Sequence, residues 1–498
     1  MEIQLIRESI PFCRELGHQT KLIQENVESI VSDIYEDIGA ILSSCAQLCL
    51  KSKDVTQHGV SITGSAEICV LYINESRGAV QCLNLSKDFS ADFDLPTVTI
   101  ESQCQVCLHC MGVQARAVNS RKVAVQLSIR ADMTCWSDES LSYAMGAEEA
   151  EQNALYLKRQ SAVLTLPTQI TEKTFSINEQ IPLSLPQNTA TRVLSTLCEL
   201  RSQDSQMIGG KALIKGTAHV QWLTLSDGDS LPQRQEAALP FSVLIDAADE
   251  KSVLSSVVFQ PTAVYSSFSE AINGSSVMEL ELHVIAQACF EKQTEIRYLT
   301  DAYSTRYPID LKDENTVLAL SRTFEAARAE AQESLTLDEG GFTVQLCNAQ
   351  ILSVSVKNDT ITASASLEVL LSSADGTLST VQKLVSAQTP LSKGDMTLQD
   401  AEITSYSCEL SGNELTMKAF FSFQLTGQEK TSLRTLSEAE LDTEAPYSVS
   451  SQPPLSAVKQ RGRTLWELAK AYNSSEDAIE KLNESYPMPN GILLIPRI

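Results

Sequence analysis

The chain has 498 residues, a formal net charge of −25 and an isoelectric point near 4.6. This acidity argues against sequence-independent binding of nucleic acid and against binding to anionic membrane surfaces, because both need clustered Lys and Arg. The length predicts about three to four domains at ~100–200 residues each. The hydrophobic content of 43% is enough for each domain to have its own core.

The compartment can be predicted from the first residues and from the cysteines. Residues 1–8 have no basic segment followed by a long apolar run, so they are not expected to be a secretory signal. No stretch approaches the ~18 apolar residues of a membrane span. The sequence therefore predicts a cytoplasmic protein, in which the 13 cysteines are expected to be free and mostly buried.

Residues 1–45 are predicted to form two helices, after which the pattern changes to β-strands. The positions that recur with a helical period are Ile23, Val27, Ile30, Val31 and Ile34 in the first stretch and Ile38, Ile41 and Leu42 in the second. From Cys45 onward, apolar runs alternate with Gly, Asn and Asp, which is typical of strands and turns.

The middle of the chain is interpreted as an internal repeat with a period of about 150 residues. Three similar strand-turn-strand segments are marked by Gly64, Gly216 and Ala363. Each is followed by a hairpin, with predicted turns at Asn119-Ser120, Asn273-Gly274 and Gly412-Asn413. Apolar residues alternate next to these turns, as at Val123, Val125 and Leu127, so one face of each sheet is expected to be buried. The predicted fold is mainly β, with tandem β-sandwich-like domains.

The predicted units are 1–150, 151–312 and 313–444, followed by a linker at 445–455. The links between the units are expected to be helical or extended. One link is the acidic, Ala-rich stretch 137–157. Another is a helix over 315–333, whose apolar face would contain Val317, Leu320, Phe324, Ala327 and Ala331.

Residues 456–498 are predicted to form a small α+β domain in the order strand, helix, helix, strand (βααβ). Thr464 and Glu467 have the spacing of a capping box at the start of the first helix. Residues 492–495 are a short apolar run that ends at Pro496, as expected of a strand. Trp466, Leu468 and Ile479 are expected to pack in the core of this domain.

This C-terminal segment resembles a LysM domain. The matching positions are Gly462, Thr464-Leu465-Trp466, Leu468-Ala469, Tyr472, Ile479, Leu482-Asn483 and Leu494-Ile495-Pro496. The resemblance implies binding of N-acetylglucosamine-containing glycans in a groove between the loop after the first strand and the loop after the second helix. The family commonly has Asp where this chain has Arg463, which reverses a charge at the edge of that groove.

The repeat units resemble SPOCS domains of sporulation proteins. The residues that carry the resemblance are the core from Gly64 to Tyr72 and the hairpin from Asn119 to Val125, while the third unit lacks the Gly and the Arg-Lys pair. Repeated SPOCS units followed by LysM are the arrangement of SipL-like spore morphogenetic proteins. That resemblance implies that the LysM domain binds the coat-basement ATPase SpoIVA, a protein partner, on the mother-cell side of the developing spore.

The leading interpretation is therefore a non-enzymatic scaffold or adaptor of spore-coat assembly, without a cofactor. The alternative is a protein that binds peptidoglycan at the spore cortex or cell wall. Repeats with exposed strand edges also allow self-association. The residues predicted to form the partner- or glycan-binding surface are Lys459, Arg461, Gly462, Arg463, Thr464 and Leu465, with Asn483 and Ile492 opposite them.

A third interpretation is a metal-dependent enzyme. Cys104, Cys107 and Cys110 form two overlapping C-x-x-C steps and could hold zinc or an iron–sulfur cluster with a further ligand from elsewhere. No second C-x-x-C lies at the spacing of a zinc finger. The five histidines are not in an H-E-x-x-H pattern, and the chain has no P-loop or G-x-S-x-G motif. The sequence thus offers no convincing catalytic set.

Overall fold

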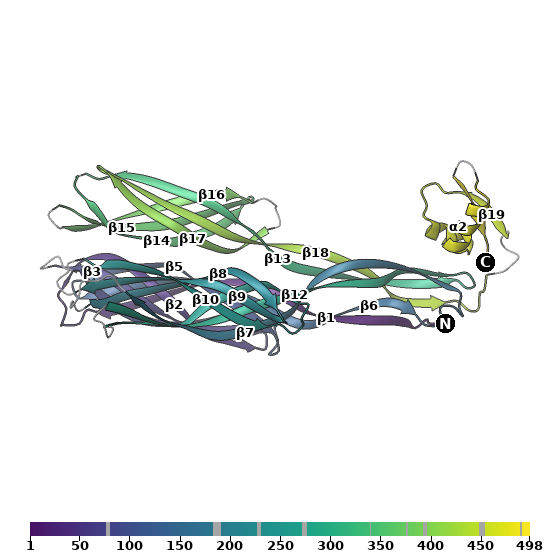
Figure 1. Cartoon of the computed structure of the whole chain (residues 1–498), viewed down its shortest axis with the longest axis horizontal. Coiled ribbons are helices and arrows are strands. Elements are labelled where there is room, and N and C mark those ends of the chain that lie inside the picture. Colours follow the sequence, from purple (N-terminus) through teal and green to yellow (C-terminus); the bar gives the residue numbers. More distant parts are fainter. Residues whose placement is uncertain are drawn as a thin grey trace.

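The structure is a computed structural model, and it describes the chain except for residues 76–79, 183–190, 227–230, 271–275, 339, 375–376, 392–395, 448–453 and 489–490. The molecule is elongated, with a broad head, a narrow stalk and a small C-terminal domain beside the far end of the stalk (Figure 1). The prediction of a mainly β fold is confirmed, since strands make up most of the described chain. Within the described residues, no helix is long and apolar enough to cross a membrane.

Three units with the same strand order make up the head and the stalk. Unit one contains β1 (Leu5–Ile30), β2 (Ile38–Thr56), β3 (Gly59–Asn74), β4 (Val80–Asp94), β5 (Gln103–Asn119) and β6 (Lys122–Ala147). Unit two contains β7 (Leu155–Pro182), β8 (Thr191–Ile208), β9 (Lys211–Ser226), β10 (Gln233–Asp246), β11 (Val253–Glu270) and β12 (Ser276–Ser304). Unit three contains β13 (Ile309–Thr336), β14 (Thr343–Lys357), β15 (Thr360–Ser372), β16 (Leu378–Pro390), β17 (Met396–Ser411) and β18 (Glu414–Leu441).

Each unit pairs its six strands into two three-stranded antiparallel sheets. In unit one the sheets have the orders β2-β3-β4 and β1-β6-β5, and units two and three repeat both arrangements. The sequence explains the core between the sheets. From Val123 to Cys135 every second residue of β6 is almost fully buried, because side chains alternate between the two faces of a strand. These side chains pack against inward residues of the other sheet, such as Ile62 and Phe93, in a sandwich-like head.

The predicted helices at residues 1–45 and 315–333 are wrong, because both stretches are strands. Ile23 and Val27 lie on β1, opposite Ile129 and Val125 of β6. A spacing of four residues keeps side chains on one face of a strand as well as on one face of a helix, so the pattern fits both structures. The same holds for Ala327 and Ala331 on β13, which pairs with β18; the side chains at 320–326 lie outside the described residues.

The predicted links and turns also differ in detail from the structure. Within the stretch 137–157, β6 continues to Ala147 and β7 begins at Leu155, so this link is mostly strand. The first hairpin turns at residues 120–121, one residue later than predicted, and the third turns at 412–413 as predicted. The predicted turn at Asn273-Gly274 lies outside the described residues, as do residues 448–453 of the predicted linker.

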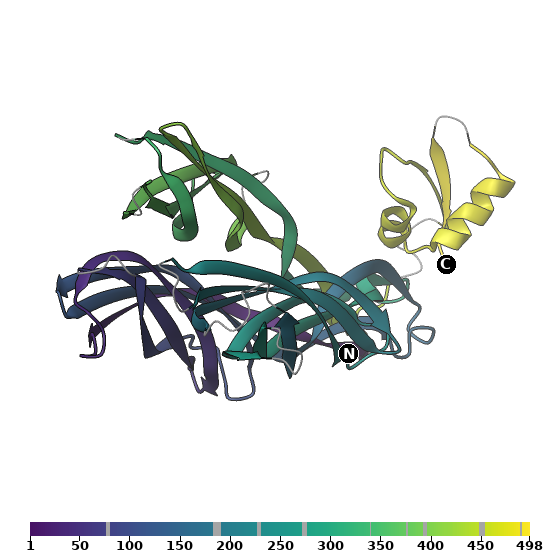
Figure 2. The same ribbon diagram turned by 60° about the vertical axis from the view of Figure 1, so that its left-hand side comes forward.

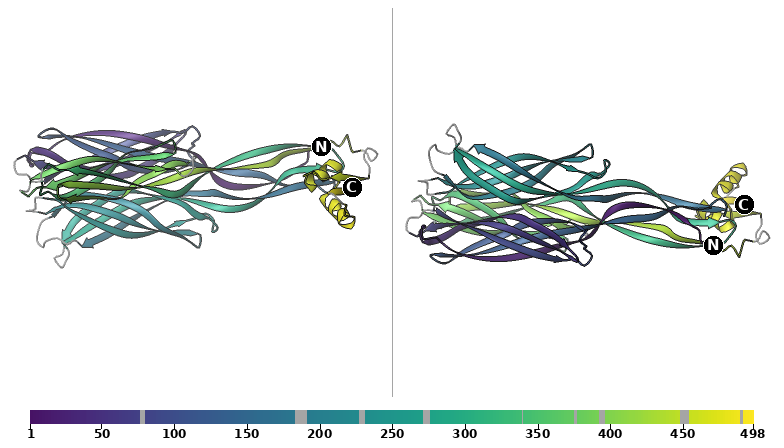
Figure 3. Two further views of the ribbon diagram at one scale, coloured as in Figure 1. Left: turned by 90° about the horizontal axis from the view of Figure 1, so that it is seen from above. Right: turned by 90° about the horizontal axis from the view of Figure 1, so that it is seen from below.

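The stalk is built from the ends of the longest strands. In each unit one sheet has a third strand, β5, β11 or β17, that is shorter than the other two. Past the end of this strand, the pairs β1/β6, β7/β12 and β13/β18 continue as two-stranded ribbons. The three ribbons wind around one another (Figure 3). An isolated two-stranded ribbon is marginally stable, so each one needs the others. Their shared core contains Phe12, Leu141, Tyr143, Leu164, Leu166, Ile296, Tyr298, Leu318 and Leu433.

The expectation that all cysteines are free is wrong for four of them. Cys104 and Cys135 form a disulfide between β5 and β6, and Cys347 and Cys408 form one between the two sheets of unit three. The other nine cysteines are free, and most of them are buried or partly buried in the head. Outside the two disulfides, these residues behave as small apolar side chains of the core.

The C-terminal domain, called the tail domain below, has the predicted order of elements. It contains β19 (Leu455–Lys459), α1 (Leu465–Tyr472), α2 (Glu476–Ser485) and β20 (Ile492–Pro496). The capping box of Thr464 and Glu467 is formed at the start of α1. Leu468 and Ile479 are fully buried, as expected of core residues. Trp466 is also buried, but its ring lies at the contact with Tyr303 of unit two.

Candidate functional site

The predicted binding surface lies on the turn between β19 and α1. Arg461 and Gly462 both have positive φ, at 48° and 81°, a conformation that glycine adopts at no steric cost. The turn is closed by the Arg463 backbone N–H, which donates to the Gln460 carbonyl at 2.9 Å. It exposes Lys459 and Arg461, while Arg463 is half-buried. The three cations therefore form a short basic edge.

The second loop of the tail domain lies directly beside this edge. Ile492 is the register partner of Lys459 on the neighbouring strand, and the Gln460 N–H donates to the Gly491 carbonyl at 3.0 Å. The structure thus brings Ile492 together with the predicted residues of the first turn. The chain between α2 and β20 also carries two exposed apolar residues that the sequence interpretation missed, Tyr486 (64% exposed) and Met488 (43% exposed). Their only signal in the sequence is their apolar character in a Pro-containing loop.

Asn483 has a different role from the other predicted surface residues. Its side-chain amide donates to the carbonyls of Ile479 and Leu494, both at 2.7 Å. Its Oδ1 accepts from the Leu494 N–H at 2.8 Å. These bonds join α2 to β20, so the amide is used within the domain and is not free to bind a partner.

One carboxylate of unit two fixes the tail domain to the stalk. Asp301 accepts from the Trp466 indole N–H at 2.8 Å and forms an ion pair with Lys470 at 2.6 Å. The Tyr303 hydroxyl donates to the Ser474 carbonyl at 2.7 Å, and its ring meets Trp466 edge-on at 4.9 Å. Burial raises the pKa of Tyr303, which keeps this donor protonated. The contact uses α1 and the turn after it, and leaves the basic edge exposed.

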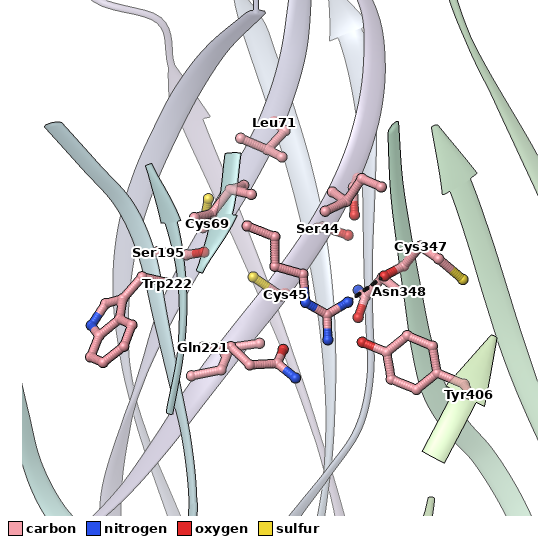
Figure 4. Close-up of a pocket in the computed structure, with 15 residues that line it drawn as sticks. Ser44, Cys45, Cys69, Leu71, Ser195, Gln221, Trp222, Cys347, Asn348 and Tyr406 are labelled. Atoms are coloured by element: carbon pink, nitrogen blue, oxygen red, sulfur yellow. Dashed lines mark hydrogen bonds between the residues drawn. The ribbon is translucent and has the colours of Figure 1, made fainter. Parts of the chain in front are cut away.

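A small cavity lies where the three units meet in the head (Figure 4). Its volume is about 50 Å³, and its lining includes Cys45 of unit one, Ser195 of unit two and Asn348 of unit three. The Arg234 guanidinium donates to the Cys347 carbonyl at 2.9 Å and lies over the Tyr406 ring. A space of this size holds only a few water molecules, and polar contacts between units surround it. The cavity is therefore a junction between units.

Three thiols line up on the sheet of unit one beside this junction. Cys69 is the register partner of Cys45, and the Cys69 and Cys82 sulfur atoms are 3.0 Å apart. A hydrogen bond with the Cys45 thiol raises the pKa of Cys69, and burial adds to the effect. The same hydrogen bond lowers the pKa of Cys45. A thiol held in the protonated state is a poor nucleophile and a poor metal ligand, which favours a packing role for Cys69.

The three cysteines of the overlapping C-x-x-C steps do not converge on a common point. Cys104 is bonded to Cys135, and the Cys107 sulfur accepts from the Gln260 amide at 3.2 Å on the side facing unit two. In the described part of the chain, no group of three or more His, Cys, Asp or Glu side chains is arranged to hold a metal ion. The metal hypothesis for Cys104, Cys107 and Cys110 therefore has no supporting geometry in the described structure.

Comparison with known families gives a match for the first unit. Residues 37–115 match the family described as SipL, SPOCS domain. The matched segment contains β2, β3, β4 and most of β5, and the same strand order recurs at β8–β11 and β14–β17. No curated protein matches the chain. The matched segment is thus a SipL-like SPOCS domain, which makes the chain a sporulation-related protein.

Proposed function

We propose that the protein is a non-enzymatic scaffold of spore-coat assembly on the mother-cell side of the spore, and that its tail domain is a LysM domain that docks to a coat-basement protein of SpoIVA type. The observation that carries this proposal is the separation of two surfaces. The head with its SPOCS-like units lies at one end, and the tail domain lies at the other, beside the end of the stalk (Figure 1). An elongated molecule of this shape can join a partner at each end.

The partner surface on the tail domain is the basic edge formed by Lys459, Arg461 and Arg463. This edge stays accessible because the tail domain faces the stalk with Trp466 and Lys470 instead. A basic patch on a strongly acidic chain favours an acidic protein surface and speeds association at low salt. The cation at position 463 supports a protein partner over a glycan, since a neutral sugar gains little from it.

The test uses the full chain and a purified SpoIVA-type protein in a surface binding assay. Arg461→Glu with Arg463→Glu is expected to raise Kd at least about tenfold and to weaken the salt dependence of the association rate. The control, Lys430→Glu with Lys481→Glu, makes the same change of net charge at exposed positions of β18 and α2. Equal binding by the docking variant and the wild type would rule out the basic edge as the partner surface.

Binding of peptidoglycan or another N-acetylglucosamine glycan is the second candidate, and exposed Tyr486 favours it. An exposed aromatic ring in the loop between α2 and β20 offers the flat apolar face on which a sugar ring can pack. This function predicts that the full chain sediments with purified peptidoglycan and that Tyr486→Ala abolishes sedimentation. The protein-adaptor function predicts no sedimentation and normal partner binding by Tyr486→Ala.

A further inference from the structure

A groove of about 620 Å³ separates the heads of units one and three. Its walls are the sheet β1-β6-β5 of unit one and strands β15 and β16 of unit three, and part of β2 also lines it. The head of unit three leans away from the other two heads (Figure 2). The volume lies within the ~300–1,000 Å³ range of ligand sites.

Three side-chain amides form a row across the wall that belongs to unit one. Gln126 of β6 is the register partner of Asn26 on β1 and of Gln114 on β5. Directly paired residues of neighbouring strands project from the same face of a sheet, so the three amides lie side by side. All three are exposed and line the groove. On the opposite wall, the Gln382 amide donates to Glu368 at 3.3 Å.

The molecule already uses glutamine amides to bind extended backbone from another unit. Gln287 of unit two accepts from the Val106 N–H at 2.9 Å and donates to the Val106 carbonyl at 2.7 Å. Gln350 of unit three accepts from the Val113 N–H at 3.1 Å and donates to the Ser44 carbonyl at 2.8 Å. In both cases the two ends of the amide pair with main-chain groups of unit one, on β5 alone for Gln287 and on β5 and β2 for Gln350.

The amide row of unit one is not needed to build the sheet. The corresponding row of unit two is Asn178, Glu281 and Tyr265, and that of unit three is Gln332, Lys418 and Ser407. Both units form the same sheet without three amides. The row in unit one is therefore available for a role other than folding.

We infer that this groove binds an extended peptide segment of a partner protein, and that the amides of Asn26, Gln114 and Gln126 pair with its main-chain N–H and C=O groups. Strands that add to existing sheets gain affinity from main-chain hydrogen bonds in the same way. Among the described residues that line the groove, none is aromatic, so a sugar ring has no face on which to stack. The lining carries one cation, Arg116, and two carboxylates, Glu28 and Glu368, and these charges set a preference for side chains of the peptide.

The probe is a displayed library of random linear peptides selected on the full chain, with selected peptides resynthesised and Kd measured by fluorescence anisotropy. Gln114→Ala with Gln126→Ala is expected to raise Kd at least tenfold. The control, Gln180→Ala with Gln332→Ala, removes two exposed amides from β7 and β13 and is expected to leave Kd unchanged. A peptide that carries one N-methylated amide in its core should bind at least tenfold more weakly, which reports on pairing with the main chain.

Three results would overturn the inference. The first is a selection that enriches no peptide. The second is an enriched peptide whose Kd is the same for the wild type and for the Gln114→Ala, Gln126→Ala variant, or is insensitive to N-methylation at every position. The third is binding of N-acetylglucosamine hexamer that is lost in the same variant, which would assign the groove to a glycan.

Discussion

Phe89 of β4 lies directly opposite Gly64 of β3, and its ring occupies the space where a side chain at position 64 would be. A Cβ atom on Gly64 would be 2.8 Å from the Phe89 ring atom Cε2 and 2.8 Å from the Cys49 carbonyl oxygen. Unit two repeats the arrangement with Gly216 and Phe241. An aromatic ring on the neighbouring strand thus restores the contacts that the glycine lacks.

Unit three replaces both members of this pair. Ala363 occupies the position of the glycine, and its partner on β16 is Ala387. Where no aromatic ring lies opposite, the position has room for a Cβ atom and can be alanine. The two paired positions are therefore glycine and phenylalanine in units one and two, and alanine and alanine in unit three. The loss of the glycine in unit three, which is visible in the sequence, is therefore explained by the residue opposite it.

Gly64→Ala is expected to destabilise unit one by about 1–3 kcal/mol, because the new methyl group overpacks a filled site. The measurement is hydrogen exchange of the amides of β3, which reports on one unit of a chain with several units. In a Phe89→Ala background the same Gly64→Ala change is expected to cost less, because the ring is gone. Equal costs in both backgrounds would show that the ring does not exclude a side chain. As a control, Ala363→Gly should cost only ~0.5–1 kcal/mol.

Asp301→Ala is expected to release the tail domain from the stalk. The carboxylate accepts from the Trp466 indole, and a hydrogen bond to a charged group contributes about 1.5–3 kcal/mol. The ion pair with partly exposed Lys470 adds little because solvent screens it. The measurement is tryptophan emission. Trp136 is buried between units one and two and Trp222 is buried in the core of unit two, so a red shift reports on Trp466.

Asp301→Asn is the informative second variant, because it keeps an acceptor for the indole and removes the ion pair. It is expected to shift the emission much less than Asp301→Ala. Asp310→Ala, at an exposed position of the stalk, is the control and should leave the spectrum unchanged. A tail domain that stays docked in Asp301→Ala would show that Tyr303 and the apolar contact are sufficient.

The sequence predicted the mainly β fold, the βααβ order of the tail domain and its capping box, since these depend on local patterns. It did not predict that residues 1–45 are strands. The spacing of Ile23 and Val27 fits the period of a helix and the period of a strand. Only pairing with β6, which lies far along the chain, decides between the two structures. Of the surface residues, the turn at 459–465 is visible locally. The use of Asn483 within the fold depends on β20 and could not be seen in the sequence.

The start of α1 is expected to lose protection at acid pH. The Thr464 backbone N–H donates to the Glu467 carboxylate and lowers the pKa of Glu467 below its ordinary value of 4.5. A lowered pKa in the folded state means that the stabilising contribution is complete above pH 4.5 and is lost as the pH falls through the lowered value. The measurement is rate-corrected hydrogen exchange of residues 464–472 between pH 6 and pH 3. Glu467→Gln keeps a capping partner that does not titrate, so a pH dependence that persists in this variant must come from another group.

Asn483→Ala separates a structural role from a binding role at this position. Removing three hydrogen bonds of ~1 kcal/mol each is expected to destabilise the tail domain by about 2–3 kcal/mol, and the Leu494 N–H loses its acceptor. A domain of this size has little stability to lose. Hydrogen exchange of α2 and β20 should therefore increase strongly, and binding to any partner should fall together with folding. Arg461→Glu is the comparison and is expected to weaken partner binding while exchange in α2 stays as in the wild type. If Asn483→Ala instead leaves exchange unchanged and selectively abolishes partner binding, the amide is a contact residue and the bonds to Ile479 and Leu494 contribute little to stability.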